Sequence, residues 1–164
     1  AKKAAQQSTK ATSTRKRAAP RATRAERTAP ELTSPEKLLY PDDRISKRQL
    51  ADYYAAVMDW LLPEIRDRPL SLLRCPAGIS AQCFFQKHDA GSFGDAVRHV
   101  PIREKDGPTE NYLYVDDAAG LLTCVQMGTI EFHGWGSLVS DVERPDRMVF
   151  DNGAVVNDSE NHAT

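Results

Sequence analysis

The sequence predicts a mixed α+β domain preceded by a basic, disordered linker. Between residues 32 and 151, short strand-like runs rich in branched and aromatic residues alternate with segments of helical spacing. Ahead of them, residues 1–31 contain no Val, Ile, Leu, Met, Phe, Trp, Tyr or Cys. The chain has 164 residues, 27% charged and 40% hydrophobic, which is material for one modest domain.

The leading segment differs sharply in charge from the rest of the chain. Residues 1–31 hold nine Lys or Arg and two Glu, a local charge of +7, whereas residues 32–164 carry a charge of −8. The leading segment cannot bury enough apolar surface to offset the entropy of ordering, so we expect it to be disordered. Two interpretations stay open: a tether that slides on phosphate backbone through counterion release, or a plain interdomain linker.

Two helices are expected in the folded part. Ser46 and Gln49 form a capping-box pattern, which marks a helix start. Apolar residues then recur at helical spacing, at Leu50, Tyr53, Tyr54, Val57, Met58 and Leu61. Pro63 is expected to end this helix or to turn the chain. A shorter helix is expected after Asp116 or Asp117, either of which could cap it, with Gly128 as its end.

Strands are predicted where short apolar runs are bounded by turn residues. They are expected at residues 70–73, 83–87, 97–102, 111–115, 129–133 and 147–151. Together with the helices they predict a mixed β-sheet with flanking helices over residues 32–151. Residues 152–164 are polar apart from Val155 and Val156, so we expect an irregular tail there.

The remaining composition narrows the class of protein. No apolar run approaches the ~18 residues that span a bilayer, and no secretory signal opens the chain, so we expect a soluble cytoplasmic protein without a membrane partner. Cys75, Cys83 and Cys124 cannot all pair and lack a CxxC spacing, so we expect reduced structural thiols. Trp60 and Trp135 are assigned to packing. The chain begins with Ala, which suggests an excised piece or a partial reading frame.

Several short strings resemble a known family when taken in order. They are Pro35-Glu36-Lys37-Leu38-Leu39-Tyr40-Pro41, Arg68-Pro69-Leu70-Ser71-Leu72-Leu73-Arg74-Cys75-Pro76, Phe84-Phe85-Gln86-Lys87-His88, Gln126-Met127-Gly128-Thr129-Ile130-Glu131-Phe132-His133-Gly134-Trp135 and Glu143-Arg144-Pro145-Asp146-Arg147-Met148-Val149-Phe150-Asp151. Over residues 32–151 they resemble the N-terminal portion of the polymerase domain of bacterial ATP-dependent DNA ligase D, in the archaeo-eukaryotic primase superfamily. The basic lead resembles the linker that precedes this domain when it follows the ligase domain.

The resemblance implies a role in bacterial non-homologous end joining. Such domains bind DNA ends with a recessed 5′-phosphate and add nucleotides, often ribonucleotides, from NTP or dNTP before sealing. They use a divalent metal, Mn or Mg, and their expected partners are the Ku end-binding ring and the ligase domain. The implied location is the bacterial cytoplasm, at the nucleoid.

Two residues resemble catalytic groups of this family. Asp151 resembles the first aspartate of a metal-binding Asp-x-Asp motif, but the second position holds Gly153. Without the resemblance, Asp151 would be interpreted as a strand-end turn residue. His133 resembles the active-site histidine of a Glu-Phe-His string, and alternation along a strand would turn it and Glu131 away from the core. On sequence alone, a lone histidine is more often structural.

Other residues resemble DNA contacts. Lys37 and Lys47, ten residues apart, resemble two lysines that grip the 5′-phosphate of the downstream strand, although two solvated lysines are the plainer interpretation. Phe84 and Phe85 resemble aromatic residues that stack near the break, and we expect one in the core and one toward DNA. Lys87 and Arg74 are further candidates for contact with the DNA backbone.

Three hypotheses about function remain. The chain is an incomplete nucleotidyltransferase domain, or a module that binds DNA ends and their 5′-phosphate without polymerising, or a piece that folds poorly and has no function. The family's Ser-Gly-Gly-Lys-Gly-x-His triphosphate motif and third metal aspartate do not occur in the sequence, so we expect no nucleotide addition and no tight metal binding by this chain alone.

Overall fold

The capping box at Ser46 starts the first helix, as the sequence predicts. In the computed structural model, which describes residues 29–88, 91–105 and 107–148, the Ser46 hydroxyl accepts from the Gln49 backbone N–H. The Gln49 amide accepts in turn from the Ser46 backbone N–H at 2.8 Å. Helix α1 (Lys47–Ala56) follows, and α2 (Met58–Ile65) begins after a break at Val57. The expected single helix is therefore two, and Pro63 lies inside α2 instead of ending it.

The third helix begins and ends at residues that the sequence identifies. Helix α3 (Ala118–Gln126) is capped by Asp117, whose carboxylate accepts from the Gly120 backbone N–H at 2.9 Å. It ends before Gly128, which has a φ of +82°. A Cβ at Gly128 would also stand 2.8 Å from the Pro76 Cα atom. Glycine is needed there both for the left-handed backbone and for the close approach of the turn after β3.

The strands form four small antiparallel sheets in the described part of the chain. The strands are β1 (Leu38–Tyr40), β2 (Ile45–Ser46), β3 (Leu70–Arg74), β4 (Phe84–Gln86), β5 (Arg98–Arg103), β6 (Thr109–Tyr114), β7 (Thr129–Gly134), β8 (Ser137–Leu138) and β9 (Asp141–Pro145). The central sheet has the order β4-β3-β7, and β1-β2, β5-β6 and β8-β9 are two-stranded. A short 3₁₀ turn, η1 (Gly94–Ala96), precedes β5. This architecture confirms the predicted α+β class.

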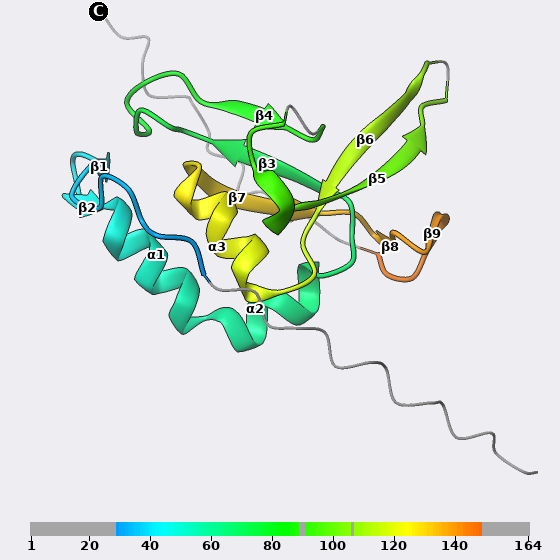
Figure 1. Cartoon of the computed structure of the whole chain (residues 1–164), viewed down its shortest axis with the longest axis horizontal. Helices are drawn as coiled ribbons and strands as arrows, with labels where there is room; N and C mark the ends of the chain where they lie inside the picture. Colours follow the sequence, from blue (N-terminus) through cyan, green and yellow to red (C-terminus); the bar gives the residue numbers. More distant parts are fainter. Residues whose placement is uncertain (1–28, 89–90, 106, 149–164) are drawn as a thin grey trace, which may run out of the picture.

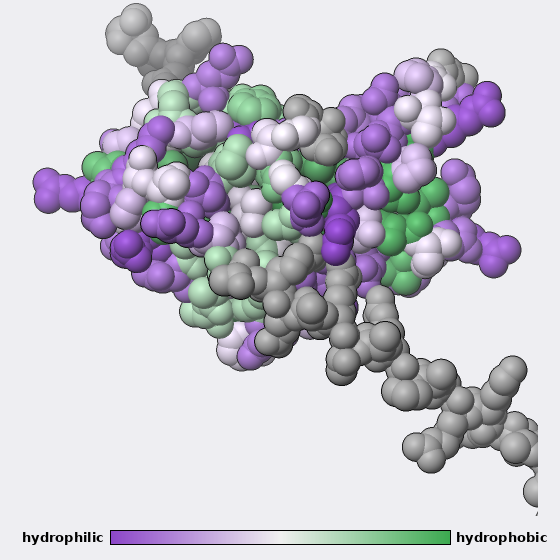
Figure 2. All heavy atoms as spheres, viewed as in Figure 1, coloured by the Kyte–Doolittle hydropathy of each residue, from purple (hydrophilic) through white to green (hydrophobic). Residues whose placement is uncertain are grey.

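The core lies between the central sheet and the helices. Figure 1 shows the three helices gathered beside β3 and β7, while the β5-β6 hairpin projects away from them. Leu70 and Leu72 of β3 are fully buried, as are Leu121 and Val125 of α3. Hydrophilic side chains gather over the two protruding hairpins, β1-β2 and the tip of β5-β6 (Figure 2). No helix in the described ranges is long and apolar enough to cross a membrane.

The cysteine prediction is wrong for two of the three thiols. Cys75 and Cys83 form a disulfide with a Cα–Cα distance of 4.4 Å, whereas Cys124 is free and buried. Arg74 pairs with Phe84 in the β3-β4 hairpin, so the next residues inward, Cys75 and Cys83, stand opposite each other. This pairing depends on the hairpin register, which spacing along the sequence does not reveal.

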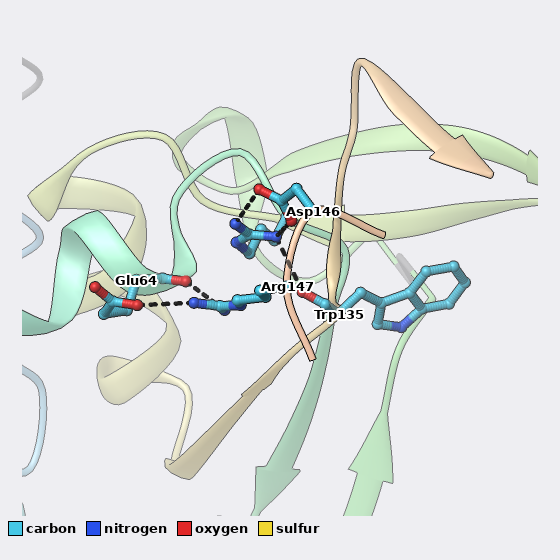
Figure 3. A network of polar contacts seen from close by, with 5 residues as sticks. Glu64, Trp135, Asp146 and Arg147 are labelled. Atoms are coloured by element: carbon cyan, nitrogen blue, oxygen red, sulfur yellow. Dashed lines mark hydrogen bonds and ion pairs between the residues drawn. The ribbon is translucent and has the colours of Figure 1, made fainter. Parts of the chain in front are cut away.

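The segment after β9 also differs from the prediction. Arg147 and Met148 lie outside any strand, and the rest of the expected strand at 147–151 lies outside the described residues. The β8-β9 hairpin, which the sequence did not predict, leads to an ionic anchor (Figure 3). Arg68 binds Asp146 through two hydrogen bonds of 2.6 and 2.7 Å, and Arg147 contacts the Glu64 carboxylate at 2.8 Å. These bonds hold the chain after β9 against α2 and the start of β3.

Candidate nucleic-acid interface

The β1-β2 hairpin brings Lys37 and Lys47 to the same place. Lys37 precedes β1 and Lys47 is the first residue of α1. Strand pairing sets Leu38 opposite Ser46, and the Lys47 backbone N–H donates to the Lys37 carbonyl at 2.8 Å. The ten-residue spacing is thus closed by a short hairpin, and the two lysines become neighbours.

The two ammonium groups have different surroundings. Lys37 is exposed, and its Nζ donates to the Pro76 carbonyl at 2.5 Å. Lys47 is only 7% exposed, and its Nζ donates to the Thr33 carbonyl at 2.9 Å. Burial lowers the pKa of Lys47, and the charge of Lys37 lowers that pKa further. Each ammonium carries three donors, so contacts with a single carbonyl leave capacity for an anion that would neutralise both charges.

His133 lies on the face of the sheet that points away from the helices. Ile130 is buried and Phe132 packs against the core, while Glu131 and His133 alternate outward as predicted. The His133 Nε2 atom is 2.8 Å from a Glu131 carboxylate oxygen, and both side chains are half exposed. The Phe85 ring meets the His133 ring edge-on, with the centroids 5.6 Å apart. This face therefore combines an aromatic surface with an imidazole and a carboxylate.

The expectation that one of the two phenylalanines lies in the core is wrong. Phe84 is 42% exposed and Phe85 is 64% exposed. Strand β4 is a three-residue edge strand, and on one of its faces the Phe84 ring meets a guanidinium instead of the core. The Arg74 Cζ atom lies 5.4 Å from the Phe84 ring centroid and 5.0 Å from that of Phe93. Both phenylalanines therefore remain available at the surface.

Arg74 itself is engaged inside the fold. It is 8% exposed, and its Nε and Nη2 atoms donate to the Met127 carbonyl at 3.0 and 2.7 Å. Its Nη1 donates to the Gln86 amide oxygen at 2.5 Å, and burial lowers the pKa of Arg74. With these partners, Arg74 links the end of α3 to β3 and β4. The structure does not present it at the surface where DNA contact was expected.

Lys87 reaches the surface but has protein partners. Its Nζ lies 3.2 Å from a Glu104 carboxylate oxygen and 3.3 Å from the Tyr112 hydroxyl. The Tyr112 hydroxyl donates to the same Glu104 oxygen at 2.7 Å. These hydrogen bonds raise the pKa of Lys87 and lower that of Glu104. A DNA phosphate would have to compete with Glu104 for this lysine.

Some of the remaining predictions concern residues that the structure describes, and others concern residues outside the described ranges. Asp151 and Gly153 lie outside the described residues, as do nearly all of residues 1–31 and the whole of 152–164. Within the described ranges no three His, Cys, Asp or Glu side chains gather to hold a metal ion. Trp135 packs against Tyr112, with ring centroids 5.1 Å apart, but Trp60 is 74% exposed, so its assignment to packing is wrong.

Sequence reasoning missed the residues that surround Lys47. The Thr33 backbone N–H donates to the Gln126 amide oxygen at 3.0 Å, and the Gln126 amide donates to the Thr33 hydroxyl at 2.5 Å. These residues are 93 positions apart, so no local pattern signals the contact. Only the docking of the loop before β1 on the end of α3 brings them together.

Comparison with known proteins finds relatives of this chain among LigD proteins. The model of the LigD primase-polymerase domain matches residues 46–152. The multifunctional non-homologous end joining protein LigD of Pseudomonas aeruginosa is 39% identical over 131 residues, which are 79% of this chain and 15% of that protein. The Mycolicibacterium smegmatis protein of the same name is 32% identical over 122 residues, which are 73% of this chain and 16% of that protein.

A solved structure agrees with these matches. The polymerase domain of Mycobacterium tuberculosis ligase D, in complex with DNA, aligns with a TM-score of 0.61 and 32% identity. The alignment covers 65% of this chain and 37% of that one, so this chain spans little more than a third of the solved domain. The family match and the fold together show that the chain belongs to the LigD primase-polymerase domain family.

Proposed function

We propose that the chain acts in bacterial DNA end-joining repair by binding DNA ends that carry a 5′-phosphate. The observation that carries the proposal is the convergence of Lys37 and Lys47, which the β1-β2 hairpin sets side by side through the hydrogen bond from the Lys47 backbone N–H to the Lys37 carbonyl. Two relatives are named as end-joining proteins, and a solved relative is a complex with DNA, which supports the same reading. The exposed Phe85 and Phe84 offer surfaces on which bases near the break can stack.

The electrostatics of the pair favour a terminal phosphate over the DNA backbone. A phosphate monoester carries about −1.5 to −2 charges at pH 7, whereas a backbone diester carries one negative charge. Two adjacent ammonium groups therefore gain more from the terminal group. Residues 32–164 carry a charge of −8, so generic attraction to DNA is weak outside such a local site.

Nucleotide addition is the second function that family membership supports. It would use NTP or dNTP with Mn or Mg, act together with Ku and a ligase domain, and take place at the bacterial nucleoid. The exposed His133 and Glu131 pair is the observation that favours it. Gly153 stands where the resemblance leads us to expect the family's second metal aspartate. We therefore assign binding, and no catalytic step, to this chain.

Matched DNA substrates test the binding proposal. Fluorescence anisotropy would compare gapped DNA with a 5′-phosphate and with a 5′-hydroxyl at the gap. Charge-assisted contacts of this kind are worth about 1.5–3 kcal/mol, so Lys37→Ala or Lys47→Ala should weaken binding to the phosphorylated DNA by about ten-fold or more. Binding to the hydroxyl substrate should hardly change. Lys105→Ala, an exposed lysine on the β5-β6 loop, is the matched control.

Two results would count against these assignments. Equal affinity of the folded wild-type protein for phosphate and hydroxyl ends would remove the binding proposal, with circular dichroism establishing that the protein is folded. Primer extension with Mn²⁺ above a no-protein control would show that the chain also adds nucleotides, contrary to the role assigned here.

A further inference from the structure

The carbonyl that accepts from Lys47 belongs to a residue held from the other side of the domain. Thr33 accepts from the Lys47 ammonium through its main-chain oxygen. Its backbone N–H and its hydroxyl both bind the side-chain amide of Gln126, at the end of α3. The backbone N–H can only donate, so it fixes which end of the Gln126 amide is the oxygen. The hydroxyl therefore receives the amide N–H.

The loop that contains Thr33 needs such an anchor. Ser34 has a φ of +49°, a left-handed conformation that costs a non-glycine residue about 1–2 kcal/mol. The far end of this loop is bound to α1, because the Arg48 backbone N–H donates to the Pro35 carbonyl at 2.9 Å. The near end of the loop, at Thr33, is held by hydrogen bonds with the Gln126 side-chain amide. The Ser34 carbonyl also accepts from the Lys37 backbone N–H, at 3.1 Å. Gln126 is the contact that holds Thr33 itself, and with it the Thr33 carbonyl, beside the start of α1.

The position of that carbonyl matters because Lys47 is buried. A lysine that is 7% exposed cannot complete its hydration freely, so its ammonium is oriented by the few acceptors around it. The Lys47 Nζ atom donates to the Thr33 carbonyl oxygen at 2.9 Å. If the loop moved, the ammonium would lose this partner and would turn toward other acceptors or water.

We propose that Gln126 and Thr33 are positioning residues of the 5′-phosphate site, acting by holding the carbonyl that orients the Lys47 ammonium. The inference rests on the proposed function, since it needs Lys47 to bind the phosphate. It extends the site from two lysines on the β1-β2 hairpin to a connected set that reaches the end of α3. The affinity for the phosphate then depends on the contact between Thr33 and Gln126 as well as on the spacing of the two lysines.

The test measures a ratio of two dissociation constants in the whole 164-residue chain. The quantity is the dissociation constant for 5′-hydroxyl gapped DNA divided by that for 5′-phosphorylated gapped DNA, in which nonspecific attraction cancels. Gln126→Ala removes both anchoring bonds and should lower the ratio about five-fold. Thr33→Val removes only the hydroxyl bond and should lower it about three-fold, and Thr33→Ser should restore the Thr33→Val loss. Asn111→Ala, an exposed amide on β6, is the matched control.

A double variant separates positioning from a general effect on the fold. In the Lys47→Ala background, Gln126→Ala should cause no further fall in the ratio, because its effect passes through Lys47. A ratio unchanged by both Gln126→Ala and Thr33→Val in folded protein overturns the inference. The inference is also overturned if Gln126→Ala lowers the ratio equally in the wild-type and the Lys47→Ala backgrounds. If Gln126→Ala does not fold, the result for Thr33→Val decides. A wild-type ratio of one overturns the proposed function itself.

Discussion

Lys47 combines a buried ammonium group with a positively charged neighbour, Lys37. Both features disfavour its charged form, and the pKa of Lys47 is lowered as a result. A bound phosphate dianion would reverse the balance by supplying the missing counter-charge. In the proposed site, the electrostatic cost at Lys47 in the free protein would therefore contribute to the selectivity for the phosphate.

The pH dependence of phosphate selectivity follows from this residue. The terminal phosphate gains its second charge near pH ~6, so the preference for 5′-phosphate should rise as the pH passes that point. It should fall again at a pH below that of an ordinary lysine, pKa 10.5, because the pKa of Lys47 is lowered. Lys47→Arg keeps its charge and should move the fall to higher pH. Anisotropy with the two substrates at pH 5–10 tests this, and a preference that stays flat above pH 7 would contradict it.

For individual residues, the roles inferred from motifs stay predictions, and the structure shows where the side chains lie. Lys37, Lys47 and His133 were assigned from short strings, and the structure places the two lysines together and His133 on the outer face. Their surroundings were not predictable. The bond from Thr33 to Gln126 spans 93 residues, and the burial of Arg74 follows from its contacts with Met127 and Gln86. Such contacts arise from tertiary packing and leave no local pattern.

Among the elements, local signals located the starts of α1 and α3 and the strands β3 to β7, but not the start of α2, the strands β1, β2, β8 and β9, or the pairing of strands. The capping box at Ser46 and the stop at Gly128 are local and are confirmed. The Cys75–Cys83 disulfide and the exposure of both phenylalanines follow from the β3-β4 register and from the edge position of β4. Register is decided by partners far along the chain, so it could not be predicted here.

The disulfide should stabilise the β3-β4 hairpin. It joins residues eight apart in sequence, and closing a loop of that size reduces the entropy of the unfolded chain by the equivalent of about 2–3 kcal/mol. Reduction should therefore lower the free energy of unfolding by about that amount, measured by urea titration with and without a reductant. Cys83→Ala is the control and should be insensitive to the reductant. No effect of reductant on the wild-type protein would mean that the bond does not stabilise the fold.

One buried hydroxyl links α1 to β7. Tyr54 is 8% exposed, and its hydroxyl donates to the Ile130 carbonyl at 2.8 Å. Tyr54→Phe leaves that carbonyl without this donor and should cost about 1–3 kcal/mol of unfolding free energy. Tyr53→Phe, at a neighbour that is 58% exposed, should change it by less than ~0.5 kcal/mol. Equal effects in urea titrations would show that the buried bond is not important.

At the scale of the whole molecule, the helices and the central sheet form one core, to which the hairpins attach. The class of fold was predictable because helix and strand patterns alternate along the chain. The β8-β9 hairpin was not, since it is held by Arg68, Asp146, Glu64 and Arg147, whose ion pairs join positions 78 and 83 residues apart. Charged residues in a polar stretch are usually solvated, so these pairs had no distinctive signal.

The distribution of charge along the chain leads to a last prediction. Residues 1–31 carry +7 and the remainder −8, so attraction to DNA backbone should reside in the leading segment and selectivity for the DNA end in the domain. Deleting residues 1–28 should make the logarithm of the binding constant less steep against the logarithm of salt concentration, by about 0.9 for each phosphate that the segment neutralises. The ratio of affinities for 5′-phosphate and 5′-hydroxyl DNA should stay the same, because the lysine pair is retained. Anisotropy titrations from 50 to 300 mM salt measure both quantities. An unchanged slope would identify the segment as a plain linker, and a fall in the ratio would place part of the end-binding site within it.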